Sequence, residues 1–191
     1  MKFNSDIDID LGNRDKLLSL IKHTHAKMYS NNEIRRHNSG VYVTDIPYDP
    51  VHDMCALDYV EAENRGYFKL DLLNVHVYTL VKDENHLREL MKEPDWSKLS
   101  DKNFVEQLVH LSNHYNTLQK MREPVNSIPR LAMFLALIRP SKKHLIGRPW
   151  AEIAQTIWDR DSDGYTFKKS HSLAYSMLVV VHMNLLSEHG T

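Results

Sequence analysis

The sequence predicts an α+β fold, with a small acidic β-sheet first and a helical half after it. Two segments predict the sheet: aspartate alternates with isoleucine over residues 6–11, and a lone aspartate interrupts the apolar run at 67–73. From Asp83 onward, apolar residues recur at helical spacing instead. We therefore expect an α+β region over residues 1–93 and a helical region over 94–191, which could together form one compact domain.

Local signals justify each element of the first region. Glycine and asparagine at 12–13 end the first strand, and asparagine is a good N-cap for the helix that should follow. Pro47 and Pro50 indicate a loop between the two later strands, because proline lacks a ladder donor. The expected elements are a strand over 1–11, a helix over 14–29, a strand over 40–44, a strand over 66–72 and a helix over 75–81.

Caps and first-turn prolines mark the helices of the second region. Ser100-Asp101 is a capping pair, and Pro129 and Pro149 suit a first helical turn. The segment 93–98 is the expected boundary between the two regions. The expected helices cover 83–92, 101–121, 129–138, 149–158 and 169–187.

Composition narrows the class of protein. The 191 residues are 42% apolar and 26% charged, which is ordinary for a soluble globular protein. The net charge of −1 makes any contact with a polyanion depend on local basic clusters. The single cysteine, Cys55, excludes an intramolecular disulfide and suits a reducing compartment. No apolar run reaches the roughly 18 residues of a membrane span, and we expect no signal peptide before the acidic strand. We expect a cytoplasmic protein without membrane contact.

Three aspartates share one face of the first strand, because side chains along a strand alternate with period two. Asp6, Asp8 and Asp10 therefore lie opposite Ile7 and Ile9, with roughly 6–7 Å between neighbouring aspartates. Such carboxylates repel one another unless a positive charge neutralises them, and a hard divalent cation takes oxygen ligands. With the lone aspartate of the second run on a neighbouring strand, the pattern predicts a phosphoryl-transfer centre with two ions roughly 3.5–4 Å apart. The alternative is a row of solvated charges at a sheet edge.

Two basic clusters could bind anions. One covers residues 139–144, just past a helix end, and the other covers 167–172, at the start of the last helix. Free N–H groups and the helix dipole favour negative charge at a helix start, and a solvated cap is the alternative. Together with the acidic strands, these clusters supply what phosphoryl transfer needs, which is metal ions on the reacting phosphate and cations on the leaving pyrophosphate.

Three further motifs suggest other chemistry. Residues 159–164 copy the start of a calcium loop, but Ser170 replaces the bidentate glutamate at its end, which favours an ordinary acidic turn. His110 and His114 are spaced to chelate zinc from one helix, or are surface histidines. Cys55 is a candidate nucleophile only where the fold brings a histidine beside it.

Five segments occur in order across nearly the whole chain. They are Ser5–Leu11 followed by Arg14-Asp15, Arg36–Val41, Gly66–Leu73, Leu135–Pro140 and Tyr165–Tyr175. The set resembles motifs of the bacterial replicative DNA polymerases of the C family, the DNA polymerase III alpha-subunit type. The first resembles the family's palm motif Pro-Asp-Ile-Asp-Ile-Asp-Phe, the second its histidine-glycine segment, and the third the strand of its third catalytic aspartate. The fourth resembles a motif of its fingers, and the fifth resembles its segment Tyr-Gly-Phe-Asn-Lys-Ser-His-Ala-Ala-Ala-Tyr.

The resemblance implies a sheet of nucleotidyltransferase-palm type, followed by a fingers-like helical half. It implies that Asp6, Asp8 and Asp71 are catalytic and bind two Mg²⁺ or Mn²⁺ ions, with Asp10 as a further ligand on the same face. DNA and a nucleoside triphosphate would be the partners. The residues expected to bind the nucleotide are His37, Lys69, Arg139, Lys142, Lys168, Lys169, Ser170 and His171.

We expect a much reduced member of that family. The chain starts at the palm motif, leaves only a short segment before His37 where the family carries its thumb, and adds no clamp-binding module after its last helix. A phage genome would account for such compactness and would place the protein in the host cytoplasm, where a partner protein could supply thumb or clamp functions. The expected function is metal-dependent nucleotidyl transfer on DNA or a nucleotide. The alternatives are a non-catalytic DNA-binding or replisome-associated subunit and a purely structural helical adaptor.

Overall fold

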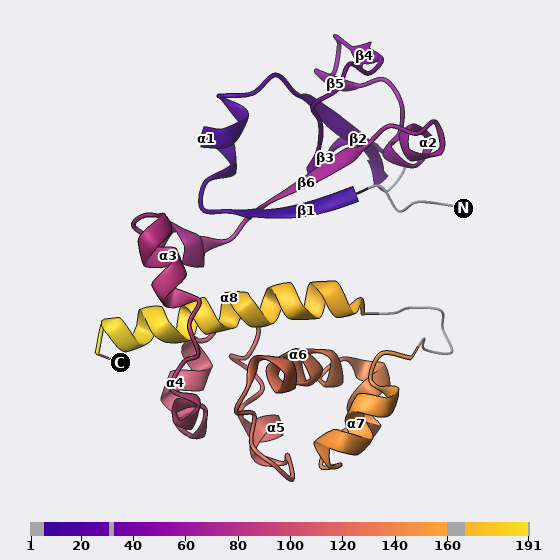
Figure 1. Ribbon diagram of the computed structural model, residues 1–191. Helices are drawn as coiled ribbons and strands as arrows, with labels where there is room; N and C mark the ends of the chain where they lie inside the picture. The colour runs from indigo at the N-terminus through magenta and orange to yellow at the C-terminus, as the bar shows by residue number, and fades with distance from the viewer. Residues whose placement is uncertain (1–5, 31–32, 160–166, 191) are drawn as a thin grey trace. The chain divides into compact units, whose positions relative to one another are not determined.

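The computed structural model describes residues 6–30, 33–159 and 167–190 (Figure 1). The chain forms two compact units, Met1–Leu80 and Val81–Thr191. The first contains a small mixed sheet and the second contains helices, so the predicted α+β class is confirmed at this level. The nucleotidyltransferase-palm type of the sheet stays a prediction.

The first unit alternates short strands and short helices. Its elements are β1 (Asp6–Leu11), α1 (Arg14–Leu18), β2 (Thr24–Ser30), β3 (Glu33–Tyr42), β4 (Tyr48–Asp49), β5 (Met54–Cys55), α2 (Tyr59–Asn64), β6 (Lys69–Asn74) and the 3₁₀ helix η1 (His76–Leu80). The main sheet has the strand order β1-β6-β3-β2, in which β1 and β6 are parallel and the other pairs antiparallel (Figure 1). Strands β4 and β5 form a separate ribbon.

The two faces of the sheet differ in polarity, as the alternation in β1 predicts. Ile9 and Leu11 of β1, Leu72 of β6 and Val41 of β3 pack together with Leu18 of α1. Asp8 and Asp10 of β1 alternate with these apolar residues and therefore belong to the opposite face. Helix α1 thus covers the apolar face of the sheet, on the side opposite to the acidic face.

The prediction of one helix over residues 14–29 is correct only for its first five residues. Helix α1 ends at Leu18, and the chain continues into β2, which pairs with β3. The side chains of Leu17, Leu18 and Ile21, which recur at helical spacing, pack α1 and the turn after it against the sheet. Pairing with β3 outweighs this helix-compatible spacing, because strand formation depends on the partner strand more than on local preference.

Helix α2 and the β4–β5 ribbon were not predicted from the sequence. They form a second small apolar cluster, in which Ala62 of α2 and Cys55 of β5 pack with Ala26 and Tyr42 of the main sheet. Asp58 caps α2 by accepting a hydrogen bond from the backbone N–H of Val60. This cluster positions α2 beside the strands that carry the candidate site.

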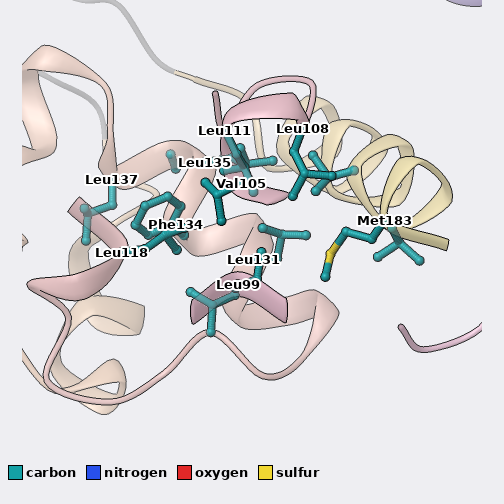
Figure 2. Packing of buried hydrophobic residues seen from close by; sticks show 14 of the residues in the cluster. Leu99, Val105, Leu108, Leu111, Leu118, Leu131, Phe134, Leu135, Leu137 and Met183 are labelled. Atoms are coloured by element: carbon teal, nitrogen blue, oxygen red, sulfur yellow. The ribbon is translucent and has the colours of Figure 1, made fainter. Parts of the chain in front are cut away.

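The second unit has one large apolar core (Figure 2). Its elements are α3 (Glu84–Leu90), η2 (Trp96–Ser100), α4 (Lys102–Gln107), α5 (Tyr115–Gln119), α6 (Ile128–Leu137), η3 (Pro140–Leu145), α7 (Trp150–Thr156) and α8 (Lys169–Glu188). Leu131, Phe134 and Leu135 of α6 and Met183 of α8 belong to this core. Among the described residues, no helix is both long enough and apolar enough to cross a membrane.

The single helix expected over 101–121 is two helices. Helix α4 ends at Gln107 and α5 begins at Tyr115. Between them His110 has a φ of 62°, a left-handed conformation that a continuous α-helix does not contain. Leu108 and Leu111 are nevertheless fully buried. Their spacing therefore reports a core-facing segment rather than an unbroken helix.

Candidate carboxylate site

The candidate site lies where β1 runs beside β6. Asp8 of β1 is the register partner of Asp71 of β6 in this parallel pair. Neighbouring strands lie about 4.8 Å apart and register partners project to the same side of a sheet, so the two aspartates share one face. That face is opposite to the one on which Leu70 and Leu72 pack. The prediction that Asp71 lies on a strand next to the aspartate strand is therefore confirmed.

Asp71 is the buried member of this pair, with 7% of its surface exposed, whereas Asp8 is exposed. Asp71 Oδ2 forms an ion pair with Lys69 Nζ, and Oδ1 accepts a hydrogen bond of 2.7 Å from Ser39 Oγ. Burial raises the pKa of Asp71, but the contacts with Lys69 and Ser39 outweigh it and hold the pKa below the usual aspartate value. Asp71 is therefore ionised at neutral pH.

His37 belongs to the same network. Its Nδ1 lies 3.6 Å from Asp71 Oδ1 and accepts a hydrogen bond of 2.9 Å from the backbone N–H of Gly40. Burial and the charge of Lys69 lower the pKa of His37, so the imidazole is neutral at neutral pH and carries its proton on Nε2. The ring packs edge-on against Tyr59 of α2, with 5.3 Å between centroids.

An irregularity in β3 brings His37 and Ser39 to Asp71. His25 of β2 pairs with Val41 of β3, but Lys27, two residues later on β2, pairs with Arg36. The residues of β3 between these two pairs therefore bulge from the ladder. A bulge breaks the period-two alternation that sequence reasoning depends on. For this reason a role could be predicted for His37, from its motif, but none was predicted for Ser39.

Gly40 makes this arrangement possible. A β-carbon on Gly40 would lie 2.8 Å from Lys69 Cδ and 2.9 Å from His37 Nδ1. Both distances are well inside van der Waals contact, so any larger residue would displace Lys69, His37 or both. The glycine therefore permits the close approach of two side chains to the buried carboxylate.

The other two aspartates of β1 flank the Asp8 position. Asp6 is the register partner of Lys69, and its side chain lies outside the described part of the structure. Asp10 is the register partner of Leu73 and is partly buried. Burial, and after it the charge of Asp10, raise the pKa of Tyr78, which lies in η1 after β6.

The chemistry of these residues suits a hard divalent cation. Asp8 and Asp71 offer oxygen ligands, and Asp71 is already deprotonated, as a ligand must be. Lys69 occupies one oxygen of Asp71, so a bound cation would share this carboxylate with the ammonium or displace it. In the described part of the chain, which leaves out the Asp6 side chain, no three His, Cys, Asp or Glu side chains converge closely enough to hold a metal ion as they stand.

The predicted nucleotide-binding residues Arg139 and Lys142 lie after α6, in the second unit. The guanidinium carbon of Arg139 lies 4.2 Å from the centroid of the Phe167 ring. Lys142 is buried, and its Nζ donates hydrogen bonds to the carbonyls of Asp159 and Thr156, at 2.8 and 3.4 Å. Lys142 therefore tethers η3 to the end of α7.

The remaining predicted basic residues form the start of α8. Lys168, Lys169 and Ser170 are exposed, and the Lys169 ammonium lies 5.8 Å from the ring of Trp158. His171 is partly buried, with its ring 6.2 Å from that of Tyr175. The structure gathers these four residues at one helix end within the second unit, and gathers the aspartates with His37 and Lys69 within the first.

The structure also bears on the three other motifs. His110 and His114 do not lie on one helix, so the prediction that they could chelate zinc from one helix is wrong. Both histidines line a cavity of about 270 Å³. Burial raises the pKa of the Cys55 thiol, which makes it a poor nucleophile. Of residues 159–164, which copy the start of a calcium loop, only Asp159 lies within the described part of the chain.

No protein-family model, no curated protein and no solved structure matches the chain. The chemistry of the site therefore rests on the contacts of its own residues.

Proposed function

We propose that the acidic face of the sheet binds a divalent cation, Mg²⁺ or Mn²⁺, and carries out nucleotidyl transfer on DNA or a nucleotide. One observation carries the proposal: Asp8 and Asp71 are register partners on adjacent parallel strands, and Asp71 is buried yet ionised. An ionised carboxylate is costly to bury, and a site for a hard cation gives it a chemical use. The resemblance of five ordered segments to C-family polymerases supports the same reaction and a palm-type sheet.

Each residue of the network has a role in this proposal. Asp6, Asp8 and Asp71 are the cation ligands, with Asp10 as a further carboxylate on the same face. A bound cation would make a hydroxyl a better nucleophile and neutralise charge on the reacting phosphate. Ser39 and Lys69 keep Asp71 ionised and fix the direction of its carboxylate. The neutral imidazole of His37 offers one N–H donor to a phosphate oxygen.

The resemblance to C-family polymerases makes the basic residues of the second unit candidates for binding phosphate groups. Lys168, Lys169 and Ser170 are exposed at the start of a twenty-residue helix, where backbone N–H groups add to the positive charge. Arg139 and His171 contribute a guanidinium and an imidazole. Lys142 contributes charge only, since its ammonium donates to backbone carbonyls. We place this reaction in the cytoplasm, with a partner protein supplying the grip on duplex DNA.

Nucleotide incorporation by the purified protein tests this function. The assay uses Mg²⁺ or Mn²⁺ with single-stranded, primed and duplex DNA, and compares the wild type with Asp8→Asn and Asp45→Asn. Asp45 is an exposed aspartate after β3 that pairs with exposed Lys22 at 2.9 Å, so Asp45→Asn is matched to Asp8→Asn in charge and shape. We expect incorporation by the wild type and Asp45→Asn, and its loss in Asp8→Asn.

A non-catalytic subunit that binds DNA or a replisome protein is a second candidate. The observation that favours it is that Lys69 and Ser39 already satisfy Asp71 without a cation. In such a protein the network serves the fold, and the aspartates of β1 are dispensable. Asp8→Asn would then leave DNA binding intact and stability unchanged or higher, because it removes repulsion between like charges. DNA binding without incorporation on any substrate by a normally folded wild type would favour this second candidate.

A further inference from the structure

The first unit contains a cleft of about 530 Å³ that is separate in its lining from the aspartates of β1. It lies between α1, the start of β2 and the bulged part of β3. Arginine and histidine dominate its walls, and Asp15 is the one acidic residue that lines it. The basic lining residues are Arg14, His23, His25, Arg36 and His37.

Arg14 has donor groups without an acceptor. Its backbone N–H donates a hydrogen bond of 2.7 Å to the side-chain oxygen of Asn74, which fixes the start of α1 to β6. Its Nε and Nη2 atoms are buried and have no hydrogen-bond partner in the described part of the chain. A charged donor that is buried without an acceptor costs free energy, and the Arg14 guanidinium would gain an acceptor by turning toward an anion in the cleft that Arg14 lines.

The other basic residues add positive potential to the same space. Arg36 is exposed, and its contact with Asp53, at 2.6 Å, is a surface ion pair that a stronger anion can displace. The rings of His23 and His25 pack edge to face, with centroids 5.0 Å apart. Burial and the positive charges of Arg36 and His23 lower the pKa of His25, as expected where cationic groups converge.

We propose that this cleft binds a phosphate group, held by the guanidinium groups of Arg14 and Arg36 and by the imidazoles of His23 and His25. Planar guanidinium groups bind phosphate oxygens in pairs of parallel hydrogen bonds, and several donors around one space suit an anion with several oxygens. The cleft volume lies within the range of about 300–1,000 Å³ typical of small-ligand sites, which leaves room for a polyphosphate. The proposal goes beyond the proposed function and needs no cation at Asp8 or Asp71.

Isothermal titration calorimetry tests the proposal. The titrants are inorganic phosphate, pyrophosphate and a short single-stranded oligodeoxynucleotide, all with EDTA so that no divalent cation contributes. Pyrophosphate that binds more tightly than the oligonucleotide identifies a small free phosphate or polyphosphate as the source of the phosphate group. The reverse order identifies the backbone of a nucleic acid as the source. Because EDTA is present, failure of cation-dependent transfer leaves this result unaffected.

Neighbouring arginines on β3 provide the matched variants. Arg35 and Arg36 are both exposed and both paired with one acid at 2.6 Å, but only Arg36 lines the cleft. We expect Arg36→Gln to weaken anion binding about tenfold, the loss of one charge-assisted hydrogen bond, and Arg35→Gln to leave it unchanged. Arg14→Gln should weaken anion binding at least as much. If Arg14→Gln fails to fold, the comparison of Arg36→Gln with Arg35→Gln still decides the test.

A gain of binding completes the test. Asp53 competes with the anion for Arg36, and its φ of 52° is a conformation that asparagine tolerates. Asp53→Asn should therefore tighten anion binding several-fold. The proposal is overturned if the wild type binds none of the titrants, if Arg35→Gln and Arg36→Gln lose equal affinity, or if Asp53→Asn weakens binding.

Discussion

The two units of the molecule bury different kinds of groups. The second unit has one large apolar core that joins residues from η2 to α8. Among the described residues, the first unit has two small apolar clusters and holds the one buried carboxylate, Asp71. Apolar packing supplies stability directly, whereas a buried ion pair supplies little and persists only where its partners are in place. The comparison indicates that one apolar core holds the second unit together, whereas the first unit combines small apolar clusters with a polar network around its buried carboxylate.

The largest expected effect comes from breaking the apolar core of the second unit. Phe134 of α6 is fully buried, so Phe134→Ala should lower the free energy of unfolding by about 3–5 kcal/mol through lost burial and the cavity left behind. All three tryptophans belong to this unit, so urea unfolding followed by tryptophan fluorescence reports on it. The control is Leu173→Ala on α8, an exposed position where the change should stay within about 0.5 kcal/mol. Equal effects at the two positions would contradict the assigned core.

Removing the buried charge should have the next largest effect. Asp71→Asn leaves the ammonium of Lys69 largely buried without its counter-ion and should cost about 2–3 kcal/mol. Asp8→Asn, at the exposed register partner, should be neutral or slightly stabilising. Hydrogen exchange of the β6 amides measures both changes in the first unit. If Asp71→Asn protects these amides as well as the wild type does, the polar network does not hold the sheet together.

A methyl group in the bulge of β3 should have a smaller effect. Gly40→Ala forces Lys69 or His37 away from Asp71 and should cost about 1–2 kcal/mol, in the range of other overpacked sites. Asn38→Ala, at an exposed position in the same bulge, is the control and should change little. Nuclear magnetic resonance of the His37 ring gives a second measurement, because displacement from Asp71 and Gly40 changes its chemical shifts. Unchanged shifts in Gly40→Ala would mean that the close approach is not required.

The smallest effect is the pH dependence that Asp71 contributes. Its pKa is lowered in the folded state, so the unfolded state binds the proton more tightly. The stability from Asp71 is therefore fully present above the unfolded pKa of about 3.9 and is lost as pH falls through the lower native pKa. The difference in unfolding free energy between the wild type and Asp71→Asn should be constant at neutral pH and shrink in this acidic range. A difference that instead grows as pH falls would contradict the lowered pKa.

The first unit also shows where sequence reasoning succeeds and fails. The alternation of aspartate and isoleucine predicted the two faces of β1, because period-two patterning is a local property of any half-buried strand. The presence of Asp71 within an apolar run predicted a buried acid on a neighbouring strand. Helix α1 and strand β2 could not be separated, since pairing with β3 is a long-range contact that local spacing does not report.

Residues of the site that lie in irregular backbone were harder to predict. Ser39 is brought to Asp71 by the bulge in β3, and no periodic pattern indicates a bulge in advance. The burial of Lys142 likewise depends on hydrogen bonds to carbonyls at the end of α7. The basic residues around Lys142 in the sequence do not indicate these long-range contacts. In the second unit the apolar spacing of Leu108 and Leu111 predicted burial but not the break between α4 and α5.

The most direct test of the central claim is thermal unfolding with increasing Mn²⁺ or Mg²⁺, measured for the wild type, Asp8→Asn and Asp45→Asn. A cation that binds only the folded state should stabilise the wild type by about 2.7 kcal/mol at 100 times its dissociation constant. The account predicts this stabilisation in the wild type and Asp45→Asn, and its loss in Asp8→Asn. Stabilisation that is absent from the wild type, or equal in Asp8→Asn, would contradict a cation site at the acidic face of the sheet.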